Sequence, residues 1–399
     1  MIEDLPKNWF RQPPDLNQVQ DADGWATYVA RRDDYQMPPL LTRSAYEGLA
    51  SRQRALYNLA RKVAVSNLPK PDTPMAAAIR EQIETTLSTN TLNADPGVRP
   101  GLFISAEGGL GKSTLMREVA ASFDEETRQM ADIFPGMFGN LDRWIPVIWI
   151  NVPPKVSIGA LCRKILNFYG EVPRGIRTEA QLTDRVHTLI RDCGTRLVVL
   201  DDITRVKMHR EADQDAADWI RGLQETSATV IGIGVDVEGC GLLYEGRAGT
   251  KQKRLLTQTR RRFSVLNLDP FTYDSAEEIT EWVAHLAAVE QDLPLLDKTP
   301  GMLSEDLPEF LFAQTGGVIG SLSRYIAEAS NAVLGRSVAD GGEHLTRDDF
   351  LKVQLDHAAV SGSSPEIDAA TSIGKKAASS RKKQRNGSFN GDRQRRVPA

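Results

Sequence analysis

Residues 101–120 read GLFISAEGGLGKSTLMREVA and hold the pattern that decides the fold. A short apolar run at 102–104 predicts a buried strand, a glycine-rich turn follows it, and Lys112 opens a segment with helical periodicity. Strand, glycine-rich loop and helix in this order form a P-loop, in which backbone N–H groups at a helix N-terminus cradle the phosphates of a nucleoside triphosphate. The match to GxxxxGK[ST] has one departure, because Ala106 stands at its first position.

The residue types of this loop suit phosphate binding. Glycine lacks the Cβ that would obstruct inward-pointing N–H groups, and Lys112 places a positive charge near the β- and γ-phosphates. Ser113 supplies a hydroxyl that can bind Mg²⁺. We therefore expect a nucleoside triphosphate and Mg²⁺ as ligands. The residues expected to contact the nucleotide are Glu107, Gly108, Gly109, Leu110, Gly111, Lys112, Ser113 and Thr114.

Composition places the chain among ordinary globular proteins. Of its 399 residues, 41% are hydrophobic and 26% are charged. No apolar run approaches the roughly 18–20 residues of a membrane span, and the N-terminal sequence MIEDLPKNWF lacks the pattern of a signal peptide. The cysteines Cys162, Cys193 and Cys240 are too widely spaced for a disulfide framework or a zinc site. We expect a cytoplasmic protein with no membrane partner.

The net charge of −4 hides a basic C-terminal end. From Thr371 onward there are nine Lys or Arg and one acid, Asp392, so this end carries +8 and the remainder −12. The segment 359–399 lacks apolar periodicity and is predicted to be a disordered tail. Polybasic tails attract nucleic-acid phosphates, whereas a purely solubilising role is the alternative.

The N-terminal hundred residues divide into two predicted parts. Residues 1–45 contain proline pairs and show little amphipathic period, which indicates an extended arm anchored by Trp9 and Trp25. Residues 46–100 are expected to hold N-terminal helices, with helical periodicity at 44–64 and 75–87.

The centre of the chain alternates between strand and helix signals. This pattern predicts an α/β fold, a parallel five-stranded sheet sandwiched by helices over 101–270, followed by a small helical lid over 271–358. Asp213 is a candidate N-cap for its helix. The expected strands are 102–104, 145–152, 196–200, 228–235 and 263–268, and the expected helices are 157–169, 178–193, 213–224, 275–289, 306–313, 318–334 and 346–355.

A pair of acids closes the buried strand RLVVL. An acid at this place in a P-loop protein usually holds Mg²⁺ through bound water, and the next acid can orient the attacking water. We assign Asp201 to the metal, together with Ser113, and Asp202 to the water. Alone, such a pair is more often a helix N-cap or a turn.

Over 101–355 the chain resembles AAA+ ATPases, and within them the TniB/TnsC-type ATPases of bacterial transposons. The resemblance rests on motifs in a fixed order: GGLGKST, IPVIWINVP, RLVVLDDI, QTRRRF (258–263) and TGGVIGSLSRYIAEASNAVL (315–334). The P-loop is generic, whereas QTRRRF together with GGVIGSLSR is more specific. This resemblance implies the AAA+ form of the P-loop NTPase fold, with ATP as the nucleotide.

The resemblance also implies roles for basic residues. Arg262 corresponds to the arginine finger that reaches a neighbour's nucleotide, with Arg260 and Arg261 as fallback candidates, and Arg324 corresponds to the second sensor. A basic surface cluster and an exposed helix arginine are the plain alternatives. Asp202 departs from the family, which more often carries Glu, and its shorter arm sets the carboxylate about 1.5 Å farther back.

The function implied is that of an ATP-dependent regulator of DNA transposition in the bacterial cytoplasm. Such a protein forms a homo-oligomeric ring or filament on double-stranded DNA and recruits or activates a transposase, and a target-selection protein is a possible further partner. We expect a slow ATPase that assembly or DNA stimulates. Arg205, Lys207 and Arg210 are candidates to face the DNA, with a solvated helix face as the alternative.

Two other functions compete with this one. A signalling ATPase of the NACHT/NB-ARC kind also carries an LVLDD-like strand, but the segment GIGVD is not followed by Thr-Thr-Arg and no Gly-Leu-Pro-Leu occurs in the lid region. A nucleotide-gated DNA scaffold with little turnover is the second, and the short side chain of Asp202 favours it. At the end of the fourth strand, Val235 and Asp236 are both open candidates for the expected polar residue.

Overall fold

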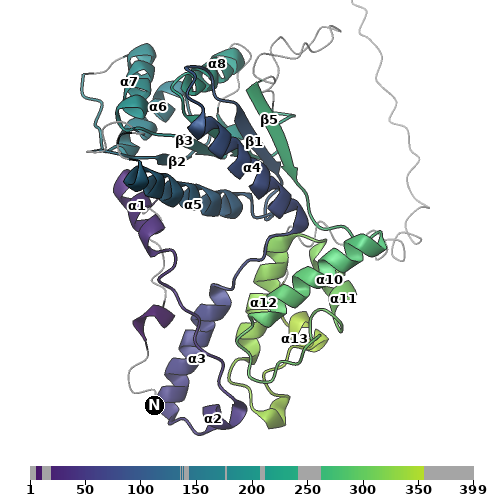
Figure 1. Cartoon of the computed structure of the whole chain (residues 1–399). Coiled ribbons are helices and arrows are strands. Elements are labelled where there is room, and N and C mark those ends of the chain that lie inside the picture. The colour runs from purple at the N-terminus through teal and green to yellow at the C-terminus, as the bar shows by residue number, and fades with distance from the viewer. Residues whose placement is uncertain are drawn as a thin grey trace, which may run out of the picture.

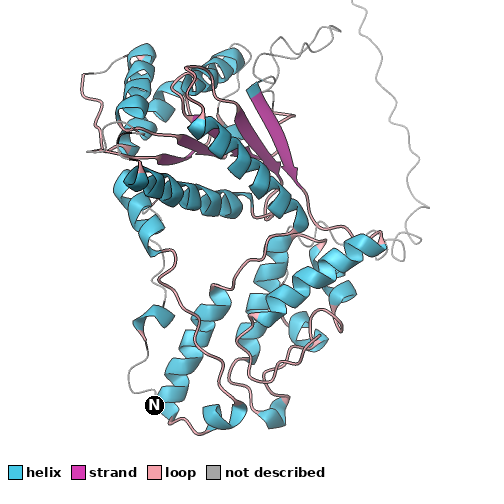
Figure 2. Cartoon of the chain, viewed as in Figure 1, coloured by secondary structure: helices cyan, strands magenta, loops and turns pink. Residues whose placement is uncertain are grey.

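The computed structural model describes residues 6–10, 19–134, 136, 138, 143–175, 178–206, 212–240 and 262–354. All the strands in this part of the chain lie in one part of the molecule, and the other part is helical (Figure 2). We call these the sheet part and the helical part. Within the described ranges, no helix is long and apolar enough to cross a membrane.

The sheet contains five parallel strands in the order β2-β3-β4-β1-β5. This confirms the predicted α/β fold. Every residue of β3 and β4 is buried, as their continuous apolar runs predict, whereas β5 at the edge of the sheet has exposed residues. The strands are β1 (Gly101–Ala106), β2 (Val147–Asn151), β3 (Leu197–Asp201), β4 (Thr229–Gly234) and β5 (Phe263–Leu268).

Right-handed crossovers decide which helices cover which face. The connection from β1 to β2 runs in the opposite direction across the sheet from the later ones, so α5 lies on one face and α6, α7 and α8 lie on the other (Figure 1). Asp213 lies inside α8 and is therefore not its N-cap, contrary to the prediction. The bounds are α5 (Lys112–Ile133), α6 (Ile158–Phe168), α7 (Glu179–Asp192), η2 (Ile203–Arg205) and α8 (Ala212–Gln224).

The helical part has its own apolar core, built around Trp282, Leu311 and Ile326, each 0% exposed. The rings of Tyr325 and Phe350 pack within it in a tilted arrangement, with 4.9 Å between centroids. The expected helix 346–355 is shorter than predicted. The elements are α10 (Ala276–Gln291), α11 (Pro308–Thr315), α12 (Ile319–Val333), η3 (Val338–Asp340) and α13 (Arg347–Leu351).

The extended N-terminal arm is a wrong prediction for residues 22–31, which form a helix, α1 (Ala22–Arg31). Trp25 anchors α1 on the sheet part, where its Nε1 donates to Asp124 at 2.9 Å and its ring stacks on Trp149 at 6.1 Å. Only Trp25 and Val29 of this helix are buried, so its apolar stripe is too short to show a period. The 3₁₀ turn η1 spans Lys7–Trp9.

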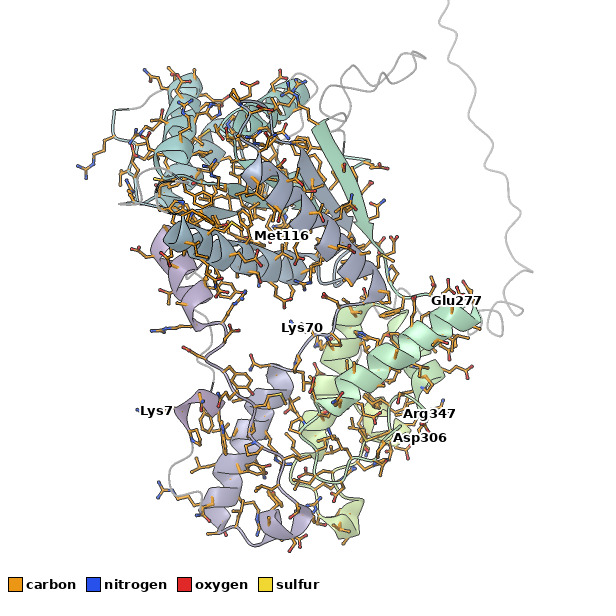
Figure 3. All side chains as sticks on the ribbon, in the orientation of Figure 1. Lys7, Lys70, Met116, Glu277, Asp306 and Arg347 are labelled. Carbon is orange, nitrogen blue, oxygen red and sulfur yellow. The ribbon has the colours of Figure 1, made fainter. Side chains whose placement is uncertain are left out.

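The expected helix 44–64 is two helices, α2 (Arg43–Glu47) and α3 (Ser51–Ser66), and α4 spans Pro74–Leu92. These helices do not form one unit. Helix α3 packs against α12 of the helical part, whereas α4 packs against α5 and β5 of the sheet part (Figure 1). The linker between α3 and α4, residues 67–73, therefore passes from one part of the molecule to the other, and Figure 3 labels Lys70 on it.

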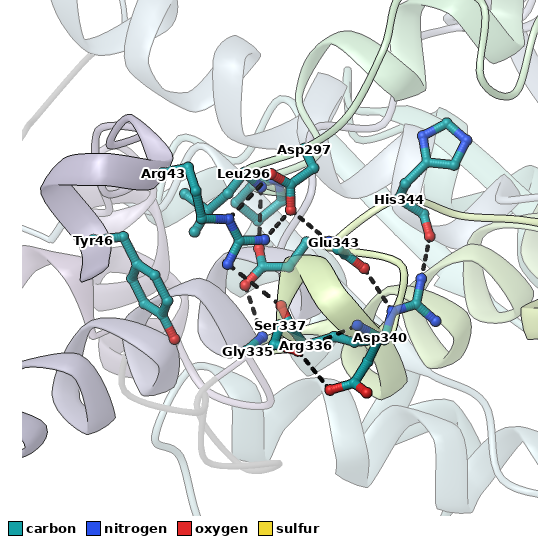
Figure 4. Close-up of polar contacts among 12 residues, drawn as sticks. Arg43, Tyr46, Leu296, Asp297, Gly335, Arg336, Ser337, Asp340, Glu343 and His344 are labelled. Carbon is teal, nitrogen blue, oxygen red and sulfur yellow. Dashed lines mark hydrogen bonds and ion pairs between the residues drawn. The ribbon is translucent and has the colours of Figure 1, made fainter.

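An ion pair in the interior fixes α3 to the helical part. Arg61 of α3 pairs with Glu343, and both side chains are 0% exposed. Beside it, Arg43 of α2 pairs with Asp297, and the Asp297 carboxylate also accepts from the Glu343 backbone N–H at 2.6 Å (Figure 4). Residues far apart in the sequence thus form one polar network. This network attaches the N-terminal helices α2 and α3 to the helical part.

Candidate nucleotide-binding site

The P-loop leaves β1 after Ala106 and enters α5 at Lys112. Gly109 and Gly111 have φ values of 83° and 81°, a left-handed conformation that glycine adopts without strain. Gly111 occupies the N-cap of α5 and has no side chain with which to cap it. The N–H groups of the first turn are thus left for a ligand, which fits an anion such as a phosphate.

The other predicted loop residues have distinct places. Leu110 is 3% exposed, so its side chain anchors the loop in the core and only its backbone can face a ligand. A Cβ at Gly108 would meet nothing within 4 Å. The Lys112 Nζ donates to the Glu107 carbonyl at 3.1 Å, which holds the ammonium group over the loop. The loop can therefore receive a phosphate chain without a change of fold.

Ser113 and Asp201 meet at the carboxyl end of the sheet. The Ser113 hydroxyl donates to Asp201 Oδ1 at 3.0 Å. Burial raises the pKa of Asp201, and the neighbouring Asp202 adds to this, whereas the hydrogen bond from Ser113 acts in the opposite sense. A hydroxyl and a carboxylate held together in this way are the oxygen donors that Mg²⁺ prefers. The residues predicted for the metal are therefore brought together.

Asp202 differs from its neighbour in backbone and environment. Its φ of 60° and ψ of 38° are left-handed, which Asp tolerates better than most residues. Its side chain is 35% exposed and pairs with Arg205 at 3.1 Å. The turn therefore directs Asp202 away from the buried position of Asp201, toward water and a basic partner.

A cavity of about 420 Å³ continues from the P-loop. One wall is the linker before α4, the floor is the loop itself, and the opposite wall comes from α10 and α12. Thr114, Leu268 and Ile326 are among the residues that line it. A cavity of this size, mostly apolar and adjoining an anion-binding loop, suits a small organic ligand with a phosphate end.

Helix α12 docks directly on the P-loop. The Gly320 N–H donates to the Gly109 carbonyl at 2.8 Å. A Cβ at Gly320 would lie 2.5 Å from that oxygen, so the close approach requires glycine. Ile319 lies 3.1 Å from the position of a Cβ at Gly111. The helix with the predicted second sensor is thus in contact with the phosphate loop.

Arg324 lies one turn further along α12 and borders the cavity. Its side chain is 59% exposed and pairs with Glu328 at 2.7 Å, which is the geometry of an ordinary i,i+4 surface pair. The arginine is near the cavity, and its present partner is a carboxylate on its own helix.

Comparison with known proteins agrees with this geometry. Residues 99–236 match the family profile described as AAA domain. The chain contains an AAA domain. Its fold, a five-stranded parallel sheet with flanking helices and a P-loop, is that of AAA+ P-loop NTPases. A search of curated protein sequences gave no match.

Solved structures similar to this chain include three proteins of archaea. ORC1 of Aeropyrum pernix in complex with DNA superposes with a TM-score of 0.51 at 12% identity, over 73% of this chain and 68% of that one. ORC2 of Aeropyrum pernix in its ADP form gives 0.48 at 15% identity, over 77% and 73%. Cdc6p of Pyrobaculum aerophilum gives 0.45 at 13%, over 72% and 68%. At these identities the similarity concerns the fold.

Arg262 lies at the other end of the AAA sheet from the P-loop. It precedes β5, whose first residue pairs in register with Gly101 at the start of β1, whereas the P-loop follows the end of β1. A strand of this length spans roughly 17 Å, so Arg262 does not share a site with Lys112 of its own chain. Its side chain is 4.0 Å from Glu225. Arg260 and Arg261 lie outside the described residues.

Neither of the two candidates for a polar residue at the end of β4 points to a role in the nucleotide site. Val235 is exposed, and the Asp236 carboxylate accepts from the Gly239 N–H at 2.9 Å, so it caps a turn. Thr204 packs over Gly234 instead, since a Cβ there would lie 2.6 Å from its methyl group. Thr204 follows the acid pair and carries no motif that could have identified it.

Two loops at the carboxyl end of the sheet are joined. The Lys155 N–H donates to the Arg205 carbonyl at 2.9 Å, and Val156 forms a parallel bridge with Val206. The backbones of the loops after β2 and β3 are therefore adjacent at Lys155 and Arg205. Lys207 and Arg210, the other predicted DNA candidates, lie outside the described residues, as does the basic tail 359–399.

Proposed function

We propose that this protein is an ATP-dependent regulator of DNA transposition that oligomerises on double-stranded DNA and recruits or activates a transposase. The observation that carries the proposal is the separation of Arg262 from the P-loop by the length of a strand. A complete ATPase site then needs two copies of the chain, which is the arrangement implied by the resemblance of QTRRRF and GGVIGSLSR to TniB/TnsC-type ATPases.

Within one copy, the P-loop binds the phosphates of ATP. The N–H groups of 107–114 hold the phosphate oxygens, and Lys112 offsets the charge on the β- and γ-phosphates. Ser113 and Asp201 would hold Mg²⁺, and that ion would neutralise charge on the phosphates. Asp202 orients the water that attacks the γ-phosphorus.

A second copy completes the site with Arg262. A guanidinium group from the neighbour offsets the charge that develops on the γ-phosphate, so hydrolysis depends on assembly. Within the first copy, Arg324 exchanges its ion pair with Glu328 for contact with the nucleotide. Because α12 is hydrogen-bonded to the P-loop through Gly320, this exchange moves the helical part with the nucleotide state.

The joined loops after β2 and β3 form the proposed DNA surface. Lys155 and Arg205 are presented side by side, and the tail from Thr371 onward adds a charge of +8. Basic groups bind the DNA backbone by release of counterions, without base specificity. ORC1 of Aeropyrum pernix, whose fold is similar, was solved in complex with DNA, which is consistent with this proposal.

One observation favours a second candidate, a nucleotide-gated DNA scaffold with little turnover. Asp202 has a short side chain, is paired with Arg205 and lies on a left-handed turn. Each of these reduces its ability to act on a water molecule at the phosphates. In this alternative, ATP binding drives assembly on DNA and hydrolysis hardly occurs.

The test is negative-stain microscopy of the full chain with duplex DNA, in ATP or ADP, together with phosphate release. We expect rings or filaments that need both DNA and ATP, and DNA-stimulated phosphate release. Lys112→Ala should abolish the assemblies, whereas Asp202→Asn should keep them and lose hydrolysis. Assemblies without measurable turnover would favour the scaffold. Absence of both assembly and DNA-stimulated turnover in the wild type would refute the proposal.

A matched pair of variants tests the shared site. Arg262→Ala and Lys112→Ala should each be inactive alone in phosphate release. Mixed together they should recover part of the activity, because some interfaces combine an intact P-loop from one copy with an intact Arg262 from the other. No recovery in mixtures that still assemble would contradict a site made by two copies.

A further inference from the structure

His285 is a polar residue in an apolar stripe. It lies on α10 with Trp282, Leu286 and Val289, all buried, and is itself only 8% exposed. Among the residues that the structure describes, its Nδ1 has no hydrogen-bond partner. Buried polar atoms nearly always have a partner, so an imidazole left in this way calls for a specific explanation.

The side chain borders the cavity that continues from the P-loop. Several other polar side chains that line the cavity have partners within the protein. Thr73 caps α4 by accepting from the Ala76 N–H at 3.0 Å, and Asp72 and Glu118 both bind Arg80. The His285 imidazole differs from these in having a ring nitrogen with no hydrogen-bond partner among the described residues.

The environment also fixes the protonation state of this imidazole. Burial lowers the pKa of His285 to about 4, so the ring is neutral near pH 7. A neutral imidazole has one donor and one acceptor nitrogen, and it can bind either an amine or a ring nitrogen. The Phe271 ring lies 5.1 Å from it and supports one side of the imidazole.

The P-loop and His285 lie at two places on the cavity wall, so each could contact a different end of one ligand. Phosphates bound at Gly109–Gly111 leave the rest of a nucleotide inside the cavity of about 420 Å³, whose wall is largely apolar. A nucleobase has apolar faces and a polar edge, which a largely apolar wall that contains the His285 imidazole would recognise. We propose that His285 hydrogen-bonds the polar edge of the nucleotide's base and is the residue that holds it.

This inference rests on the proposed nucleotide binding, and the experiment separates the two. Titration calorimetry of the full chain with Mg²⁺ compares ATP with tripolyphosphate, which has the phosphates and no base. His285→Leu should weaken ATP binding by about tenfold and leave tripolyphosphate within about twofold. His344→Leu makes the same change outside the cavity and should alter neither.

The outcomes differ for the two proposals. If the wild type binds neither ATP nor tripolyphosphate, nucleotide binding itself is wrong, and the role of His285 is wrong with it. If the wild type binds ATP and His285→Leu binds it equally well, nucleotide binding stands and the role of His285 is refuted.

If His285→Leu does not fold, a measurement on the wild type can test the same inference. The chain has five histidines, so selective ¹⁵N labelling of histidine gives a readable spectrum. The Nδ1 resonance of His285 should shift on addition of ADP and not on addition of tripolyphosphate, because only the base reaches it. A resonance that ADP leaves unchanged would overturn the inference.

Discussion

The buried pair of Arg61 and Glu343 allows a quantitative test of how α3 is held. Both side chains are fully buried, and the Glu343 carboxylate also accepts from the Leu296 N–H at 3.0 Å and the Gly335 N–H at 2.7 Å. Glu343→Gln keeps the shape of the side chain, but it replaces an acceptor by a donor and leaves the Arg61 charge without a counter-charge.

Removal of one member of a buried ion pair costs about 3–5 kcal/mol. Since about 1.4 kcal/mol corresponds to a factor of ten, the local opening of α3 should become roughly 100- to 4,000-fold more frequent. Hydrogen exchange followed by mass spectrometry reports this opening. Amides of α3 should lose protection by that factor, whereas those of α5 in the sheet part should change by less than about tenfold.

Glu171→Gln is the matched control, because the Glu171–Arg185 pair is partly exposed, at 24% and 37%. A surface pair contributes about 0–1 kcal/mol, so exchange there should change by less than about tenfold. Adding Arg61→Met to Glu343→Gln removes the unpaired charge and should restore part of the protection. If Glu343→Gln changes the exchange of α3 amides by less than about tenfold, the pair does not hold this helix.

Further predictions concern the nucleotide loop, the acid pair and the helical part. Gly320→Ala places a Cβ 2.5 Å from the Gly109 carbonyl, so it should destabilise the docked α12 by about 1–3 kcal/mol and weaken ATP binding in calorimetry. Asp202→Glu lengthens the side chain by about 1.5 Å and should raise DNA-stimulated phosphate release by about tenfold or more. Burial raises the pKa of Asp349, but hydrogen bonds from Arg336 and Thr346 outweigh it and hold the pKa at about 2. Since the unfolded carboxyl titrates near pKa 3.9, the stability from Asp349 is present above about pH 4 and is lost as pH falls from about 4 to 2, which near-ultraviolet circular dichroism can follow.

Each of these has a control. Ser323→Ala borders the same cavity as Gly320 and removes atoms rather than adding them, so ATP affinity should stay within about threefold. Equal ATP affinity of Gly320→Ala and the wild type would contradict the importance of the docked α12. An Asp202→Glu variant no faster than the wild type would show that side-chain length is not what limits turnover. Asp349→Asn should flatten the acid transition, and an unchanged transition would show that another group causes it.

Strands β3 and β4 were predictable because they are buried on both faces. Runs such as RLVVL and ATVIGIGV are continuous and apolar, so the strands at 197–201 and 229–234 agree with the expected ranges within two residues. The P-loop and the acid pair were located by motif, and Ser113 meets Asp201 as the metal assignment required.

The features that the sequence did not predict depend mostly on contacts between distant parts of the chain. Helices α3 and α4 look alike in sequence, and contacts with distant residues, such as the pairing of Arg61 with Glu343, show that α3 goes with the helical part. His285 belongs to the expected helix 275–289, and its lack of a partner is visible only once α10 borders the cavity. The left-handed backbone conformation of Asp202 is also a feature that no pattern of residues in the sequence predicts.

The path of the N-terminal chain determines how this protein can be dissected. The chain passes between the two parts at 32–42, again at 67–73, and finally after Leu268. A fragment that contains only 99–236, the span of the AAA profile, would lose one cavity wall with the linker, the other with α10 and α12, and the strand β5. A fragment of this kind would retain the P-loop and lack both walls of the cavity that continues from it, so it would test whether the loop alone is sufficient to bind a nucleotide.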